Sequence, residues 1–218
     1  MSVHALKHPL ALEWPAEWLD PLPNGLEHLH HWAQTTPLHT ALRHKREGQW
    51  YAWRWIDVSR DVERLADGLR QQDFSEHSRL ALSGAFEPNL LLLALAAHSI
   101  GGQVLTLADS LEPEVLEYHL RRIRPTHTYA RHWSLDNGLD FAELLGPVDP
   151  AQYLTRWWQP SDETALWSEQ STQSRGALAA VLEQWLSSGH GFAFGDRPEV
   201  AAPGNWRQRL YEWALAKR

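Results

Sequence analysis

A loop rich in hydroxyl groups lies at residues 168–176, between an apolar run and a run with helical spacing. Its sequence, SEQSTQSRG, supplies hydroxyls from Ser168, Ser171 and Thr172 and a guanidinium from Arg175. Loops between a strand and a helix bind phosphate in many enzymes, because the helix N-terminus and the loop N–H groups favour negative charge there. The residues leave three interpretations open: a working phosphate site, a degenerate one or an ordinary turn.

Two other sets of side chains carry groups that could bind a metal or catalyse a reaction, and each set has a simpler interpretation. His28 and His31 are one helical turn apart and could share a metal ion, but no pattern places a third ligand beside them, so we interpret them as surface histidines and expect no metal. Ser168, His190 and Asp196 contain the groups of a hydrolase triad. No Gly-x-Ser-x-Gly stretch surrounds the serine, so a triad is not expected.

The elements that position these residues follow from the spacing of apolar side chains. Helical spacing predicts short helices over residues 26–36 and 55–69. In the second helix the charged residues, including Asp57 and Asp61, fall largely opposite the apolar stripe. Between the helices, the runs TALRHKR and QWYAWR flank Glu47-Gly48, a pattern typical of a β-hairpin.

Strands and helices alternate through the rest of the chain. The expected strands are 79–83, 103–107, 126–130, 163–167 and 191–195, and the expected helices are 88–100, 113–123, 177–186 and 206–216. Such alternation implies right-handed βαβ crossovers. The predicted fold class is therefore α/β, a mainly parallel sheet of βαβ units flanked by helices, with a small β-hairpin near the N-terminus.

The predicted domain organisation is an arm followed by one domain. Residues 1–25, rich in Pro and Trp without a steady period, are expected to form an arm over the surface, and 26–218 a single α/β domain. Within that domain we distinguish 26–131, a connecting stretch at 132–161 that holds one possible turn of helix, and 162–218 with the hydroxyl-rich loop and a C-terminal helix.

Composition and charge exclude several classes of protein. The chain has 218 residues and a net charge of -7, so non-specific attraction to nucleic acid is not expected. It has no Cys, which fits a reducing cytoplasm. Its N-terminal residues form no signal peptide, and no apolar run approaches the roughly 20 residues needed to span a bilayer. We expect a cytoplasmic protein without a membrane span.

Short motifs follow one another in order through the first half of the chain. They are Trp32 and Pro37 before Ala41-Leu42-Arg43, then Gly48-Gln49-Trp50, Trp53 to Trp55, Gly68-Leu69, Glu87-Pro88, Gly101-Gly102, and Glu114-Val115 through Leu120. In this order they resemble the N-terminal part of AMP-forming acyl-CoA synthetases, which are adenylate-forming ligases. The long-chain fatty acyl-CoA ligases look nearest.

The resemblance places the hydroxyl-rich loop at the phosphate loop of that family, Thr-Ser-Gly-Ser/Thr-Thr-Gly-x-Pro-Lys-Gly, which holds ATP. The positions that match, with one residue deleted, are Ser168, Ser171, Thr172, Arg175 and Gly176. We treat these five residues as the candidate remnant of a nucleotide- or anion-binding site.

Other positions of the loop depart from the family pattern. Gln170 and Gln173 stand where the family has its two inner glycines, and glutamine resists the positive φ angles and close backbone approach that glycine permits. Glu169 adds a negative charge where phosphates would lie. Arg175 can still meet an anion, with a fork in place of the point charge of lysine.

The resemblance also implies parts that these 218 residues do not show: a Tyr-Gly-x-Thr-Glu stretch near adenine and metal, an Asp for ribose, and a C-terminal domain with a catalytic Lys. We therefore expect a shortened, non-catalytic relative that binds a protein partner or an acyl or nucleotide ligand in acyl or fatty-acid metabolism. No catalytic residue and no cofactor is expected, beyond residual ATP or AMP binding. The alternatives are a component of an active acyl-CoA or acyl-AMP ligase completed by another chain, and an unrelated α/β binding protein.

A part of a larger fold exposes a sheet edge and apolar surface, and such surfaces are usually covered. We expect a homodimer or a protein complex, with a full-length ligase or an acyl carrier protein as candidate partners. The chain has 13 Trp residues, a type enriched at interfaces. The candidate partner contacts are Trp157, Trp158, Trp206 and Trp213.

Overall fold

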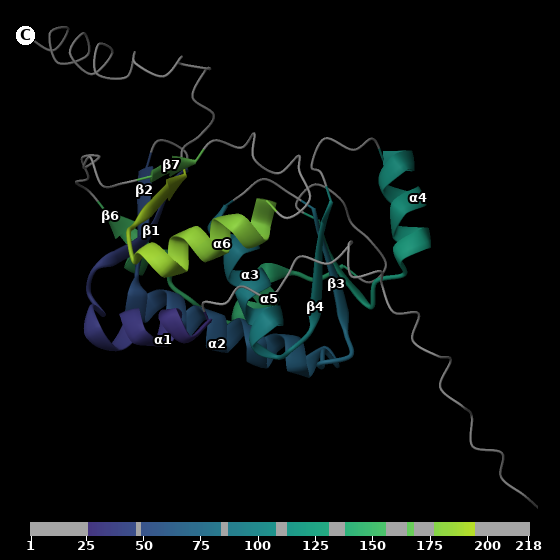
Figure 1. Ribbon diagram of the computed structural model, residues 1–218, viewed down its shortest axis with the longest axis horizontal. Helices are drawn as coiled ribbons and strands as arrows, with labels where there is room; N and C mark the ends of the chain where they lie inside the picture. The colour runs from purple at the N-terminus through teal and green to yellow at the C-terminus, as the bar shows by residue number, and fades with distance from the viewer. Residues whose placement is uncertain are drawn as a thin grey trace, which may run out of the picture.

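The fold consists of two β-sheets with helices between and around them (Figure 1). The structure, a computed structural model, describes residues 26–46, 49–83, 87–107, 113–130, 138–155, 165–167 and 177–194. One sheet has the strand order β6-β2-β1-β8-β7, and the other has the order β4-β3-β5. Strands from both sheets contact helix α3, which lies between them.

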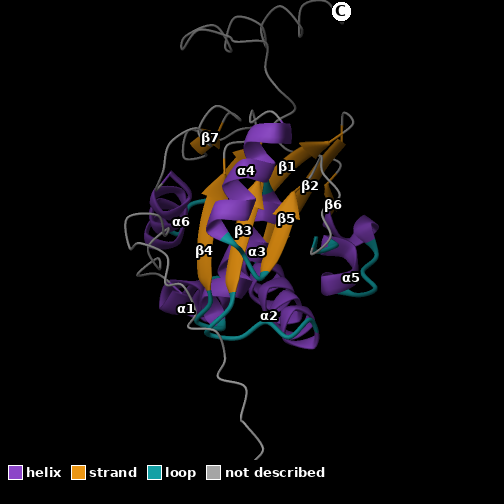
Figure 2. Cartoon of the chain, turned by 90° about the vertical axis from the view of Figure 1, so that its right-hand side faces the viewer, coloured by secondary structure: helices purple, strands orange, loops and turns teal. Residues whose placement is uncertain are grey.

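The three-stranded sheet, in which β3 lies between β4 and β5 (Figure 2), is built from consecutive elements, as the sequence predicted. Its elements are β3 (Arg79–Ser83), α3 (Pro88–Ser99), β4 (Gln103–Leu107), α4 (Pro113–Ile123) and β5 (His127–Ala130), and β3 pairs in parallel with both β4 and β5. Pro88 stands in the first turn of α3, where its missing N–H costs nothing. Gly101, with φ of 89°, follows the helix and turns the chain into β4. The βαβαβ prediction is confirmed.

Helix α3 is the centre of the core. Every residue from Leu90 to Ala97 is at most 1% exposed, because both sides of the helix are covered. One polar side chain shares this environment: His98 is 4% exposed, and neither of its ring nitrogens has a hydrogen-bond partner among the described residues. Burial disfavours the charged imidazolium and lowers the pKa of His98 to about 4.

The five-stranded sheet joins distant parts of the chain. Strands β1 (Thr40–Arg46) and β2 (Gln49–Arg54) form the antiparallel hairpin that the sequence predicted. The hairpin is not a separate small unit, however. Strand β1 also pairs in parallel with β8 (Phe192–Phe194), with Leu42 opposite Phe192, and β8 pairs with β7 (Ala165–Trp167). Periodicity cannot reveal such a partner, because it reports which face is buried and not which strand lies alongside.

Helices α1 (Leu26–Thr35), α2 (Trp55–Gln71) and α6 (Ala177–Ser188) join this sheet through aromatic side chains. Trp185 of α6 is fully buried, stacks on Trp55 with ring centroids 5.4 Å apart, and donates its indole N–H to the Ala41 carbonyl oxygen at 3.0 Å. Trp32 of α1 donates to the Leu186 carbonyl oxygen at 2.7 Å. These tryptophans therefore serve packing within the domain.

The described part of the connecting stretch, residues 138–155, contains more secondary structure than the sequence predicted. It contains α5 (Phe141–Leu145), which matches the expected turn of helix, followed by a 3-10 helix η2 (Pro150–Tyr153) and strand β6 (Leu154–Thr155) that pairs with β2. Helix α5 packs closely on α2, where a Cβ added to Gly68 would lie 2.3 Å from the Leu144 carbonyl oxygen. Only glycine permits this approach, so Gly68 fixes the position of α5.

Some predictions concern residues that the structure does not describe. These are the arm at 1–25 and the expected helix at 206–216. The domain boundaries accordingly stay predictions.

Candidate functional site

The frame of the expected phosphate loop is present. Strand β7 ends at Trp167 and α6 begins at Ala177, so the loop connects a parallel strand to a helix N-terminus, as the sequence predicted. The loop residues Ser168, Ser171, Thr172, Arg175 and Gly176 lie outside the described residues. Their role as an anion-binding remnant stays a prediction.

The remaining sequence candidates are also only partly within the described residues. Trp157, Trp158, Trp206 and Trp213 lie outside them, as do Ser168 and Asp196, two of the three residues that contain the groups of a hydrolase triad. His190 is described and exposed. His31 is exposed and His28 partly so, and no group of three His, Asp or Glu side chains suited to a metal occurs in the described part of the chain.

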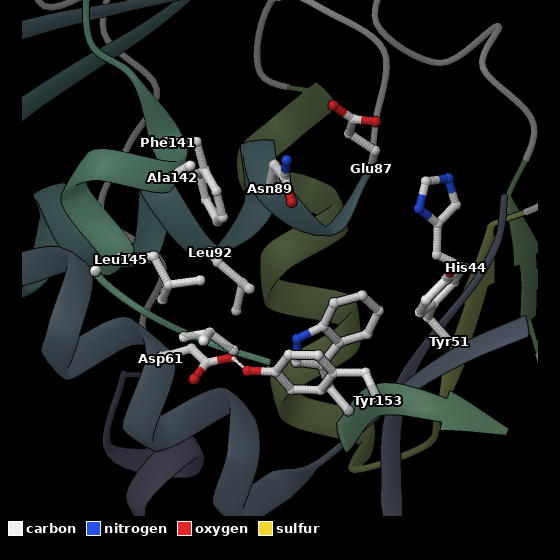
Figure 3. Close-up of a pocket in the computed structure, with 13 residues that line it drawn as sticks. His44, Tyr51, Asp61, Glu87, Asn89, Leu92, Phe141, Ala142, Leu145 and Tyr153 are labelled. Atoms are coloured by element: carbon white, nitrogen blue, oxygen red, sulfur yellow. Dashed lines mark hydrogen bonds between the residues drawn. The ribbon is translucent and has the colours of Figure 1, made fainter. Parts of the chain in front are cut away.

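A pocket of about 480 Å³ opens between the β1–β2 hairpin, α2, the start of α3 and α5 (Figure 3). This volume falls within the range of roughly 300–1,000 Å³ that is usual for small-molecule sites. The lining residues are His44, Tyr51, Trp53, Asp61, Glu87, Asn89, Leu92, Phe141, Ala142, Leu145, Gly146, Val148 and Tyr153.

One end of the pocket is held by a buried hydrogen-bond network. The Tyr153 hydroxyl donates to Asp61 Oδ2 at 2.6 Å, and Arg60 Nε donates to Asp61 Oδ1 at 3.1 Å. Arg60 Nη2 also donates to the Tyr153 hydroxyl oxygen at 3.1 Å. The Tyr153 ring stacks on Trp53 with centroids 4.8 Å apart. The tyrosine ring is thus fixed at both its edge and its face.

Burial controls the protonation of this network. Burial raises the pKa of Asp61, and hydrogen bonds from Tyr153 and Arg60 offset only part of that rise. Burial also raises the pKa of Tyr153, and the neighbouring Asp61 raises it further. The phenol therefore keeps its proton, so Tyr153 acts as a hydrogen-bond donor and not as a base.

Asp57, a second carboxylate, holds the start of α2 one helical turn before Asp61. The Arg54 backbone N–H donates to Asp57 Oδ2 at 3.1 Å and Arg54 Nε donates to the same oxygen at 2.7 Å. Arg60 Nη1 lies 3.2 Å from Asp57 Oδ1. Burial alone would raise the pKa of Asp57, but the hydrogen bonds from Arg54 outweigh it, so this pKa is lowered. Asp57 is a structural cap.

Sequence reasoning missed this pocket and misplaced two of its supporting residues. Asp57 and Asp61 were expected opposite the apolar stripe of α2, yet they are 4% and 0% exposed. The reason is that Tyr153, which approaches from a distant part of the chain, covers Asp61, while Arg54 covers Asp57. Helical spacing carries no signal for the contact of Tyr153 with Asp61, whereas Arg54 and Asp57 are three residues apart at the start of α2, the spacing of a capping box.

The two sheets and the strand–loop–helix frame have the fold of the N-terminal subdomain of adenylate-forming ligases. Residues 29–191 match the family described as AMP-binding enzyme, and the chain belongs to this family. The resemblance predicted from the sequence is confirmed at this level.

Solved structures of this class share the fold at low identity. The N-terminal subdomain of NpsA from Klebsiella oxytoca, in complex with anthranilyl-AMSN, is 12% identical with a TM-score of 0.61, over 92% of this chain and 59% of that chain. The O-succinylbenzoate coenzyme A synthetase MenE from Bacillus subtilis is 12% identical with a TM-score of 0.61, over 85% and 46%. The luciferase-like enzyme from the mealworm Zophobas morio is 11% identical with a TM-score of 0.60, over 93% and 60%.

The chain thus spans about half to three fifths of the length of these structures. No curated protein matches it. Within the described residues, no helix has both the length and the apolar character required to cross a membrane.

Proposed function

We propose that this chain is a non-catalytic member of the AMP-binding family that acts by binding, either to a protein partner or to an acyl or nucleotide ligand in acyl metabolism. The observation that supports it is the composition of the loop between β7 and α6, with Gln170 and Gln173 at the family's glycine positions. Glycine at such positions permits the positive φ angles and the close approach of backbone to phosphate that glutamine resists.

Charge supports the same proposal. Adenylation transfers AMP from ATP to a carboxylate, and it requires cationic stabilisation of the pyrophosphate that leaves. Glu169 adds a negative charge to the loop, and Arg175 is its one cationic side chain. The loop therefore carries no net positive charge, which leaves little to hold a triphosphate.

Restoring the family pattern provides the test. We expect the natural chain to bind ATP·Mg²⁺ weakly in a calorimetric titration, and to give no pyrophosphate exchange with a fatty acid. A variant with Glu169→Ser, Gln170→Gly and Gln173→Gly regains backbone access and loses one negative charge, so it should bind ATP at least about tenfold more tightly, a difference of about 1.4 kcal/mol. AMP and acyl-CoA are titrated in parallel. Tight ATP binding with exchange by the natural chain would refute the proposal.

A second candidate function is a ligase component that is completed by another chain. It is supported by the share of the solved ligase structures that this chain spans, 46% to 60% in the comparisons above. In that case pyrophosphate exchange should appear only when the completing chain is added. The remaining alternative, an unrelated protein whose likeness ends at the fold, is disfavoured by the family match over residues 29–191.

We further propose that the chain associates with itself or with a protein partner, such as a full-length ligase or an acyl carrier protein. Strand β4 is an outer strand of the three-stranded sheet, while β5, the other outer strand, bridges to Gly138, and α4 exposes Val115 at 42% and Tyr118 at 60%. Exposed strand edges and apolar side chains favour association. Light scattering should show a species larger than one chain, and a strictly monomeric protein at high concentration would contradict this.

A further inference from the structure

The pocket between the β1–β2 hairpin, α2, α3 and α5 has a chemistry different from that of the loop after β7. We propose that it binds a small organic cation, a compact amine with one aromatic ring system that enters as its ammonium ion. The proposal does not depend on the function proposed above, because it is argued only from described residues of the hairpin, α2, α3, α5 and η2.

Charge is the first argument. Two acidic residues line the pocket, Asp61 and Glu87, and no Lys or Arg is among the described residues that line it. Asp61 is fully buried and paired with Arg60, so Glu87 supplies the negative charge that a ligand would meet. Arg60 lies behind Asp61, donates to it at 3.1 Å and also bonds to Tyr153, but it is not part of the pocket wall. A ligand carboxylate or phosphate would meet like charge here, whereas an ammonium group would meet opposite charge.

Aromatic rings are the second argument. Tyr51, Trp53, Phe141 and Tyr153 all line the pocket, and they come from three different parts of the chain. The face of an aromatic ring carries negative electrostatic potential and attracts cations, as in the aromatic cages that bind ammonium groups. The Trp53–Tyr153 stack is held by the bond from Tyr153 to Asp61, so these rings are already positioned before a ligand enters.

The arrangement of polar and apolar groups sets the shape of the ligand. Glu87 and Asn89 lie at the opposite end of the pocket from Asp61 and Tyr153, and Leu92 and Leu145 lie on the wall between them (Figure 3). A carboxylate oxygen can accept more than one hydrogen bond, so Glu87 keeps acceptor capacity whatever partners it already has. A ring against the apolar wall with a short aminoalkyl chain toward an acidic end fits this pattern.

Three indole compounds of nearly equal size separate charge from shape. Tryptamine carries an ammonium group, tryptophol a hydroxyl, and indole-3-propionate a carboxylate on the same ring system. In calorimetric titrations of the full chain, we expect tryptamine to bind at least about tenfold more tightly than indole-3-propionate, with tryptophol between them. Equal or tighter binding of indole-3-propionate, or no detectable binding of tryptamine, would overturn the proposal. This comparison needs no variant.

A charge-neutral variant locates the binding. Glu87→Gln keeps the size of the side chain and removes its charge, so tryptamine affinity should fall about tenfold, while tryptophol affinity stays unchanged. Glu114→Gln makes the same charge change at an exposed position on α4, a helix with no residue among the described lining of the pocket, and should leave both affinities unchanged. Circular dichroism confirms that each variant is folded. Equal losses in the two variants would show attraction to the net charge of -7 and not to the pocket, and would overturn the proposal.

Discussion

Replacing Trp185 by alanine is expected to lower the free energy of unfolding by about 3–5 kcal/mol. The side chain is fully buried, stacks on Trp55 and contacts Phe192, and its indole N–H donates to the Ala41 carbonyl oxygen. Alanine removes these contacts together and leaves a cavity between α6 and the five-stranded sheet. Domains of this size are stable by only about 5–15 kcal/mol in total, so the loss is a large fraction of the whole.

Urea unfolding of the variant, followed by far-ultraviolet circular dichroism, measures the loss as a shift of the midpoint. Trp185→Phe is the matched control, because it keeps an aromatic ring in the stack and loses the hydrogen bond and some volume. We expect it to cost about half as much. If Trp185→Ala unfolds at the natural midpoint, then α6 does not close the core in the way described.

The second large expected effect is a loss of stability at low pH, caused by the protonation of His98. In the folded protein burial lowers the pKa of His98 to about 4, while in the unfolded chain it is about 6.5. The unfolded state therefore binds the proton more readily, so stability is full above pH about 6.5 and decreases as the pH falls toward about 4. The difference in pKa corresponds to a loss of about 3 kcal/mol once the imidazole is protonated in both states.

Urea midpoints measured across this pH range test the effect. His98→Leu fills a similar volume without a proton site. Over the same fall in pH, the variant should therefore lose about 3 kcal/mol less stability than the natural chain. The raised pKa of Asp61 acts in the opposite direction, but it is present in both proteins and cancels in the comparison. Parallel pH profiles for the natural chain and the variant would show that His98 is not buried as described.

The elements of the fold could be predicted wherever the information is local. The stretch 79–130 could be interpreted from periodicity alone, because each strand is followed by its own helix and Pro88 and Gly101 mark the ends of α3. The position of the β1–β2 hairpin in a larger sheet could not be predicted. Its partner strand β8 is set by packing over the whole domain, not by the sequence of the hairpin.

The same distinction applies to the two candidate sites. The loop between β7 and α6 could be located from its composition and from the strand and helix around it. The pocket could not, because it forms where Asp61 on α2 meets Tyr153 from the connecting stretch, and the sequence around neither residue points to the other. The burial of a carboxylate on the polar face of a helix can be predicted only when the distant residue that donates a hydrogen bond to it is known.

The pairing of β1 with β8 has a consequence for the order in which the molecule assembles. The three-stranded sheet needs only residues 79–130, and contacts that are close in sequence form faster than those that close a long loop. Strand β8 is synthesised after all of these elements. Until β8 is synthesised, the edge of β1 that pairs with β8 in the folded domain, where Leu42 lies opposite Phe192, lacks this partner strand. Open strand edges favour aggregation. The nascent chain is therefore expected to depend on chaperones over this interval.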